Sequence, residues 1–152
     1  MKEPNQELIA ALQKAYAMEL ETVQNYIAAS INLDGVRSDV IKKSLSADVA
    51  EELSHAQLIA NRIKTIGGQV PGSMDLERGQ TSLQPLDDST DVVSVIKGVI
   101  DAEDAAIEHY NHVIRLADGV DYVTEDMVVT LLADEEEHRR QFVGFLREYE
   151  KG

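Results

Sequence analysis

Apolar residues recur every three or four positions through four long stretches of this chain, and that spacing is typical of one buried face of an α-helix. The fourth stretch is the most regular, because its apolar face advances in alternating steps of three and four residues. The pattern predicts helices at about residues 5–33, 38–66, 90–118 and 124–149.

The residues between these stretches are those that end and begin helices. Gly35, Gly67 and Gly119 stand where the first three helices should stop, and every proline lies outside the periodic segments. Ser89 or Thr90 can cap the third helix, and Asp121 or Thr124 can cap the fourth.

The lengths of the connections predict how the helices are arranged. Residues 34–37 and 119–123 are short links, so each joins its two helices into an antiparallel hairpin. Residues 67–90 form a much longer link, which could run the height of a bundle and hold a short additional helix. We therefore expect an all-α fold, with residues 1–152 forming a single domain. Within it, two helical hairpins and a long crossover make an antiparallel four-helix bundle.

Composition removes several classes of function. The 152-residue chain has no cysteine, which excludes disulfides, zinc–thiolate sites, iron–sulfur clusters and a thiol nucleophile. Its 28 acidic and 14 basic residues give a net charge of −14, which argues against nucleic acid as a partner and is compatible with attracting cations. Without a targeting signal or an apolar run of membrane-spanning length, a cytoplasmic protein with no membrane partner is expected.

Candidate chemistry lies on the apolar faces themselves. Each predicted helix has one Glu on its apolar stripe, and the second and fourth helices add a His three positions later, on the same face. The six residues are Glu19, Glu52, His55, Glu103, Glu135 and His138. A carboxylate in an apolar core is costly unless it is paired or bound to metal, and four carboxylates balance two divalent cations. The pattern therefore predicts a two-metal site in the core of the bundle.

The types of donor atom restrict which metal ions the site could bind. Four Glu and two His without a thiolate suit iron(II) or manganese(II) and tolerate zinc. Two such ions ~3.5–4 Å apart could share dioxygen or peroxide. A single Glu-x-x-His usually lies on a solvated helix face. Two copies, each following a Glu one helix earlier, favour the metal interpretation.

Four aromatic residues are expected in the core of the bundle. Tyr26 and Tyr110 each follow a stripe Glu by seven residues and are expected in the core, where a hydrogen bond to a site carboxylate remains open. Phe142 and Phe145 are expected in the core.

The remaining polar residues near the pattern are expected to face away from it. His109 and His112 follow Glu103 by six and nine residues, which predicts exposed side chains. Several acidic residues are sequence neighbours of the stripe glutamates but should have solvated or inner-surface roles: Glu21, Glu51, Glu136 and Glu137.

The order Glu, Glu-x-x-His, Glu, Glu-x-x-His over residues 5–149 resembles the ferritin-like superfamily, and within it bacterioferritin. The resemblance implies a di-iron ferroxidase centre within each subunit, with two iron ions per chain held by the six residues. Glu52 and Glu135 would bridge the ions, and Tyr26 would stand beside the centre. It further implies oxidation of iron(II) by dioxygen or peroxide, and storage of iron(III) inside a homo-oligomeric shell.

Two departures from bacterioferritin bear on cofactor and assembly. Leu53 occupies the position of the methionine that binds haem in that family, so haem is not expected. Only 14 residues follow His138 (139–152), which leaves little chain for the fifth helix of 24-subunit ferritins. A 12-subunit shell of the Dps type therefore stands beside the 24-subunit one. Ordinary Dps proteins build their iron site between subunits, whereas this chain has a complete set.

Two other functions remain open. One is a peroxide-scavenging enzyme like rubrerythrin or manganese catalase. Rubrerythrins usually have another Glu three residues after the third stripe Glu, where this chain has Ala106. The other is a metal-stabilised helical oligomer without activity.

Overall fold

A computed structural model describes residues 3–151, and this part of the chain is helical with no strand. The four long helices lie within a few residues of the predicted ranges, and each has an interior free of proline. They are α1 (Gln6–Asn32), α2 (Asp39–Thr65), α3 (Val92–Ala117) and α4 (Tyr122–Glu150). Two single turns of 3₁₀ helix, η1 (Val36–Ser38) and η2 (Ser73–Asp75), lie in the connections.

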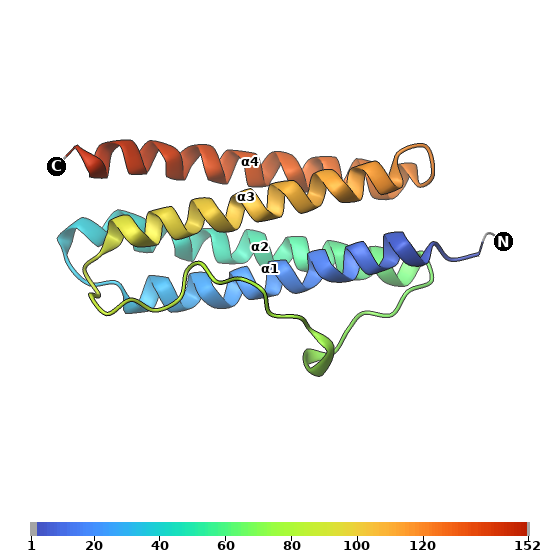
Figure 1. Cartoon of the computed structure of the whole chain (residues 1–152), viewed down its shortest axis with the longest axis horizontal. Helices are drawn as coiled ribbons and strands as arrows, with labels where there is room; N and C mark the ends of the chain where they lie inside the picture. The colour runs from blue at the N-terminus through green and yellow to red at the C-terminus, as the bar shows by residue number, and fades with distance from the viewer. Residues whose placement is uncertain (1–2, 152) are drawn as a thin grey trace.

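The helices form the expected bundle of two antiparallel hairpins. Figure 1 shows α1 beside α2 and α3 beside α4, with the N and C termini at opposite ends of the bundle. The link between α2 and α3 runs along the whole length of the bundle before α3 begins, so α1 and α4 point in the same direction. The antiparallel four-helix bundle with a long crossover is therefore confirmed. None of the helices within residues 3–151 is long and apolar enough to cross a membrane.

Side chains and glycines end the helices where the sequence suggested, with one exception. Asp121 caps α4 by accepting a hydrogen bond from the Thr124 backbone N–H, as predicted. At the end of α2, Gly67 adopts a φ of 96°, and the N–H of Gly68 donates to the Ile63 carbonyl, which is a Schellman motif. The cap of α3 is Asp91, so the expectation of Ser89 or Thr90 is wrong. Asp91 is the residue whose carboxylate accepts from the Ser94 N–H.

The crossover is an extended strap that contains only the 3₁₀ turn η2, and not a further α-helix. The Glu21 carboxylate on α1 accepts hydrogen bonds from the backbone N–H groups of Gly79 and Gln80. Farther along, Leu83 is buried with a φ of 63°. A Cβ atom on Gly98 of α3 would lie 3.1 Å from the Leu83 backbone nitrogen, so glycine permits the close approach of strap and helix.

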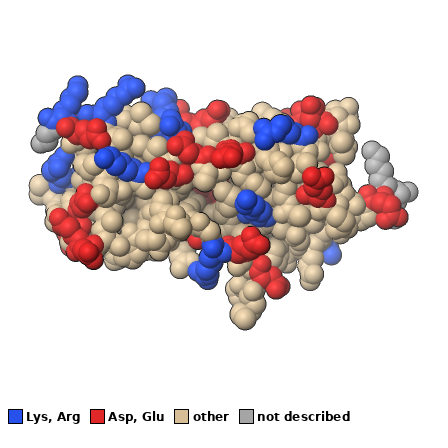
Figure 2. Space-filling view, in the orientation of Figure 1, with Lys and Arg blue, Asp and Glu red and all other residues tan. Residues whose placement is uncertain are grey.

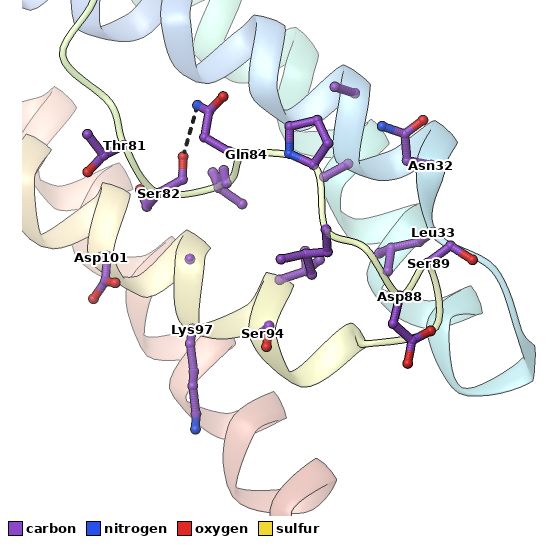
Figure 3. A pocket seen from close by; sticks show the side chains of 17 residues that line it. Asn32, Leu33, Thr81, Ser82, Gln84, Asp88, Ser89, Ser94, Lys97 and Asp101 are labelled. Carbon is purple, nitrogen blue, oxygen red and sulfur yellow. Dashed lines mark hydrogen bonds between the residues drawn. The ribbon is translucent and has the colours of Figure 1, made fainter.

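The strap also forms the wall of a groove of about 670 Å³ against the ends of α1 and α3. Figure 3 shows the residues that line it, among them Asn32, Gln84 and Lys97. None of the six stripe residues lies in this groove, so it is separate from the candidate metal site. On the face shown in Figure 2, acidic and basic side chains are interspersed, and several Lys and Arg gather near the end that holds the C terminus.

The core consists of two apolar clusters. One contains Leu12, Ile59 and Leu131, and the other contains Leu45, Ile96 and Phe142. Phe142 is fully buried, while Phe145 packs against the second cluster with partial exposure. Burial of such side chains contributes about 1.5–3 kcal/mol each. The stripe glutamates and histidines lie between the two clusters in every helix sequence, so an apolar core closes the polar layer above and below.

Candidate metal centre

All six residues predicted for the metal site lie together in this polar layer, one Glu from each helix and one His from each of α2 and α4. Each is between 1 and 5% exposed. They come together because each occupies the inward position of its helix, three or four residues from its apolar neighbours. The residues are Glu19, Glu52, His55, Glu103, Glu135 and His138.

The donors form two overlapping groups. In the first, one donor atom from each of Glu19 and His55, together with one from each shared carboxylate, all lie within 4.8 Å of one another. In the second, Glu103 and His138 meet the same condition with the same two carboxylates. The shared residues are Glu52 and Glu135. Two neighbouring cations could therefore be held with these carboxylates in contact with both.

The imidazoles face the carboxylates with their Nδ1 atoms. His55 Nδ1 lies 3.0 Å from a Glu135 carboxylate oxygen, and His138 Nδ1 lies 3.0 Å from a Glu52 carboxylate oxygen. Each histidine thus meets the carboxylate of the opposite hairpin, across the interior from α2 to α4.

Several polar atoms in this layer are buried without a hydrogen-bond partner in the protein. They are Glu19 Oε2, Glu103 Oε2, and the facing atoms Glu52 Oε1 and His138 Nδ1, whose 3.0 Å contact does not have the geometry of a hydrogen bond. An unpaired buried polar atom is costly, and buried carboxylates in particular are expected to be paired or to coordinate metal. Orphaned oxygen and nitrogen donors that converge on one point are the arrangement that a divalent cation would satisfy. The residues present therefore fit a dinuclear metal group.

The pKa values of the buried carboxyl groups also favour a metal site. Burial raises the pKa of the Glu52 carboxyl to about 10, and the neighbouring Glu19 contributes to the shift. Burial also raises the pKa of Glu103, and that of Glu135 well above its usual range. Of the four glutamates, Glu19 alone has a lowered pKa, because its close contacts with Glu52 and His55 outweigh the effect of burial. Without metal the cluster must retain protons, whereas two divalent cations would allow all four carboxylates to ionise.

Two buried tyrosines cross between the hairpins to reach the cluster. Tyr26 on α1 donates a hydrogen bond to Glu103 on α3 at 2.5 Å, and Tyr110 on α3 donates to Glu19 on α1. Burial and the neighbouring carboxylates raise the pKa of both phenols well above 10, so both stay neutral donors. Tyr26 and Tyr110 are therefore in the core, and each hydrogen-bonds a site carboxylate.

Two expectations about residues outside the six are wrong. His109 is buried rather than exposed, because its Nε2–H donates to the Ala11 carbonyl of α1 at 2.8 Å. Burial lowers the pKa of His109. His112 is exposed as predicted. Glu51 does not face away from the site, since its carboxylate lies 2.7 Å from His138 Nε2.

The sequence interpretation also missed an outer set of acids around the histidines. Asp134 lies 3.0 Å from His55 Nε2, and Asp48 lies 3.7 Å from His138 Nε2. The available signal was that an acid directly precedes the Glu of each Glu-x-x-His: Glu51 before Glu52, and Asp134 before Glu135.

With this geometry established, known proteins provide a comparison. The family model of the ferritin-like domain matches residues 9–151 of this chain. A "DNA protection during starvation protein" from Pyrococcus furiosus is 25% identical over 141 residues, which cover 90% of this chain and 75% of the relative. A bacterioferritin from Desulfovibrio desulfuricans is 26% identical over 134 residues, which cover 86% of this chain and 69% of the relative.

Solved structures agree with these sequence matches. A dodecameric thioferritin from Bacteroides fragilis, described as bacterioferritin-related, superposes with a TM-score of 0.86 at 25% identity, covering 96% of this chain and 88% of that one. A ferritin-like, diiron-carboxylate protein from Bacillus anthracis has a TM-score of 0.83 at 21% identity, covering 96% and 99%.

The family match spans nearly the whole chain, including all six stripe residues, and the fold is shared with the structural neighbours. The chain therefore belongs to the ferritin-like family and resembles its bacterioferritin branch.

Proposed function

We propose that this protein is a ferroxidase, which oxidises iron(II) to iron(III) at a dinuclear site inside each subunit. The observation that carries the proposal is the pair of overlapping donor groups that share Glu52 and Glu135, fully buried at the centre of the bundle. In the proposed site Glu19 and His55 hold one ion, Glu103 and His138 hold the other, and the two shared carboxylates contact both.

Iron(II) is the substrate in this proposal. Two iron(II) ions give up one electron each, and dioxygen with two protons becomes hydrogen peroxide. With peroxide as the oxidant, hydrogen peroxide takes the same two electrons with two protons and becomes two water molecules. The nitrogen and oxygen donors suit iron(II) or manganese(II), and zinc would bind without turnover.

The protein's own residues prepare the site for this substrate. Burial raises the pKa of Glu52 to about 10 and also raises the pKa of Glu103 and Glu135, and metal ions would favour the ionised form of all three carboxyls. Tyr26 and Tyr110 keep one oxygen of Glu103 and one of Glu19 in hydrogen bonds, so the second oxygen of each remains free for an ion. The apolar clusters on both sides exclude water and make these electrostatic interactions stronger.

We further propose that iron(III) is stored in a homo-oligomeric shell of 12 or 24 subunits, built in the cytoplasm without nucleic-acid or membrane partners. The dodecameric assembly of the thioferritin relative supports the smaller shell. In this proposal the entire chain acts as one domain.

The test is iron(II) oxidation followed by oxygen consumption and iron(III) absorbance, with the molecular mass measured by light scattering. Purified protein should oxidise two iron(II) ions per chain rapidly, and then accumulate many more within a particle of 12 or 24 subunits. Glu52→Ala together with His55→Ala should abolish the rapid phase. Glu136→Ala together with Glu137→Ala removes two carboxylates from the exposed surface of α4 and is the matched control. Unchanged rapid oxidation in the site variant would refute the centre. Fast peroxide consumption with only two irons per chain would indicate the scavenging enzyme instead.

A further inference from the structure

A second cavity, of about 720 Å³, lies between α1, α3 and the strap. None of the six stripe residues lines it, so it is separate from the dinuclear centre. Two histidines of α3, His109 and His112, do line it, and they have no role in the function proposed so far. We therefore examined what these two side chains could bind.

The buried histidine of this cavity has a fixed tautomer and an unused lone pair. The Nε2–H of His109 donates to the Ala11 carbonyl at 2.8 Å, so the lone pair of the neutral ring lies on Nδ1. Within residues 3–151 nothing hydrogen-bonds to this Nδ1, although the side chain is only 9% exposed. A backbone carbonyl on one ring nitrogen is a usual way to orient a histidine that binds metal through the other.

The protonation state of His109 also favours a ligand role. Burial lowers the pKa of this imidazole, and the positive charge of Lys14 adds to the shift. The ring is therefore neutral at pH 7, and its Nδ1 lone pair is available to an ion.

The second histidine is placed to share an ion with the first. His112 follows His109 by three residues, so the two rings lie on the same side of α3. Their ring centres are 6.0 Å apart. Because a zinc–nitrogen bond is about 2.0–2.1 Å long, two imidazoles on one ion have ring centres at most about 6.5 Å apart. The observed separation is within this limit, and the exposed His112 side chain can turn toward the ion.

A carboxylate completes the set of donors. Glu108 is exposed, lines the same cavity and precedes His112 by four residues, which places the two side chains side by side on the helix. Two imidazoles and one carboxylate, with water in the remaining positions, suit zinc, iron(II) and similar divalent cations.

The charges around the cavity determine how strongly such an ion would bind. Lys14 is the basic residue that acts on His109, and its ammonium would repel a cation there. The site should therefore be weaker than the dinuclear centre, and it should become tighter when Lys14 loses its charge. Acidic residues nevertheless outnumber basic ones in the lining. They are Glu21, Glu77, Asp101 and Glu108, against Lys14, Arg78 and Arg115.

We propose that His109, His112 and Glu108 form a third divalent-cation site in each subunit, separate from the dinuclear centre. The inference goes beyond the proposed ferroxidase and does not depend on it. An ion held here has no neighbouring cation with which to share dioxygen, so the site binds an ion without being a second oxidation centre.

The experiment counts the zinc ions bound per chain of the full-length protein, by equilibrium dialysis and metal analysis. Wild type should bind three, and His112→Ala should bind one fewer. His109→Gln retains a side-chain N–H that can donate to Ala11 but lacks the Nδ1 lone pair, so it should also bind one fewer.

Three further variants make the result specific. Glu108→Gln should weaken the third ion by about tenfold or more, because loss of a ligand costs at least as much as loss of a ligand's hydrogen-bond partner. Lys14→Leu should keep the wild-type count and hold the third ion severalfold more tightly. Glu136→Gln neutralises an exposed acid of α4 and should match wild type. Circular dichroism confirms that every variant is folded.

A protein without the dinuclear centre isolates the third ion. Glu52→Ala together with His55→Ala should still bind one zinc ion, and X-ray absorption of that ion should show scattering from two imidazoles. Adding His112→Ala to this protein should remove the ion.

Two results would overturn the proposal. Equal zinc counts in wild type, His112→Ala and His109→Gln would exclude the two histidines as ligands. A remaining zinc ion with fewer than two imidazoles in the protein without the centre would exclude their sharing of one ion. Failure of the dinuclear centre looks different: Glu52→Ala with His55→Ala would bind as many ions as wild type, while His112→Ala would still bind one fewer. That result would remove the ferroxidase centre and support the third site.

Discussion

Replacing Glu52 by glutamine should stabilise the metal-free protein while it damages the metal site. In the unfolded chain the pKa of this carboxyl is near 4.5, and in the folded chain burial raises it to about 10. The folded state therefore binds a proton that the unfolded state lacks over this whole interval, and stability falls as the pH rises through it. The neutral amide of Glu52→Gln avoids that proton uptake, and its N–H₂ and C=O can occupy the positions of the protonated carboxyl.

The magnitude follows from the pKa values. The interval from pKa 4.5 to pH 7, at about 1.4 kcal/mol per pH unit, amounts to about 3–4 kcal/mol of folding free energy. Glu52→Gln should therefore be about 3–4 kcal/mol more stable than wild type at pH 7. The advantage should grow by about 1.4 kcal/mol per unit at higher pH and shrink toward zero near pH 4.5.

The assay is urea unfolding followed by circular dichroism, in EDTA, at one protein concentration and at several pH values from 5 to 8. The matched control is Glu136→Gln, an exposed acid of α4, which should show no such pH-dependent gain. Added zinc should then stabilise wild type much more than Glu52→Gln, because the variant lacks a shared carboxylate. A stability difference that does not change with pH, or a variant less stable than wild type at pH 8, would refute the reasoning.

Three further predictions concern the same structure. Tyr110→Phe leaves Glu19 without its phenol donor, so it should destabilise the metal-free protein by about 1–2 kcal/mol and slow iron(II) oxidation in stopped-flow measurements, whereas Tyr16→Phe should do neither. The close contact with Glu52, together with the neighbouring Asp48 and Glu51, outweighs burial and raises the pKa of His138 from 6.5 to about 10. Protonated His138 therefore stabilises the metal-free fold below pH 6.5, and this contribution is lost as the pH rises toward 10. The calorimetric melting temperature in EDTA should fall from pH 6 to 9, and a rise would contradict the raised pKa of His138. Gly98→Val places a side chain against the Leu83 backbone and should cost about 1–3 kcal/mol in urea unfolding without changing the number of zinc ions bound, whereas Gly144→Ala, with open space around it, should be neutral or stabilising by up to about 1 kcal/mol.

Patterns within single helices and links were sufficient to predict most of the fold. Helix periodicity, glycine punctuation and link lengths predicted four helices and two hairpins within a few residues, because an amphipathic helix records its buried face in its own sequence. The cap of α3 was the exception, since Asp91, Thr90 and Ser89 are all acceptable caps and only the path of the strap selects one.

The convergence of the six stripe residues was also predictable, because a carboxylate repeated on the apolar face of every helix has only the interior to occupy. The two tyrosines followed the same periodicity, but their hydrogen-bond partners did not. Tyr26 reaches Glu103 and Tyr110 reaches Glu19, and such a crossing depends on how far apart the two hairpins lie.

By itself, the sequence determined the helices, their inward faces and the donors of the proposed centre, since all of these depend on spacing along one helix. Only the tertiary structure decided the contacts between helices. It buried His109 beneath α1, and it brought Glu51 and Asp134 to the histidines of the opposite hairpins. Those residues lie at the edges of their helix faces, where periodicity does not distinguish solvent from a neighbouring helix, and the relative position of the two hairpins determines which of them each side chain meets.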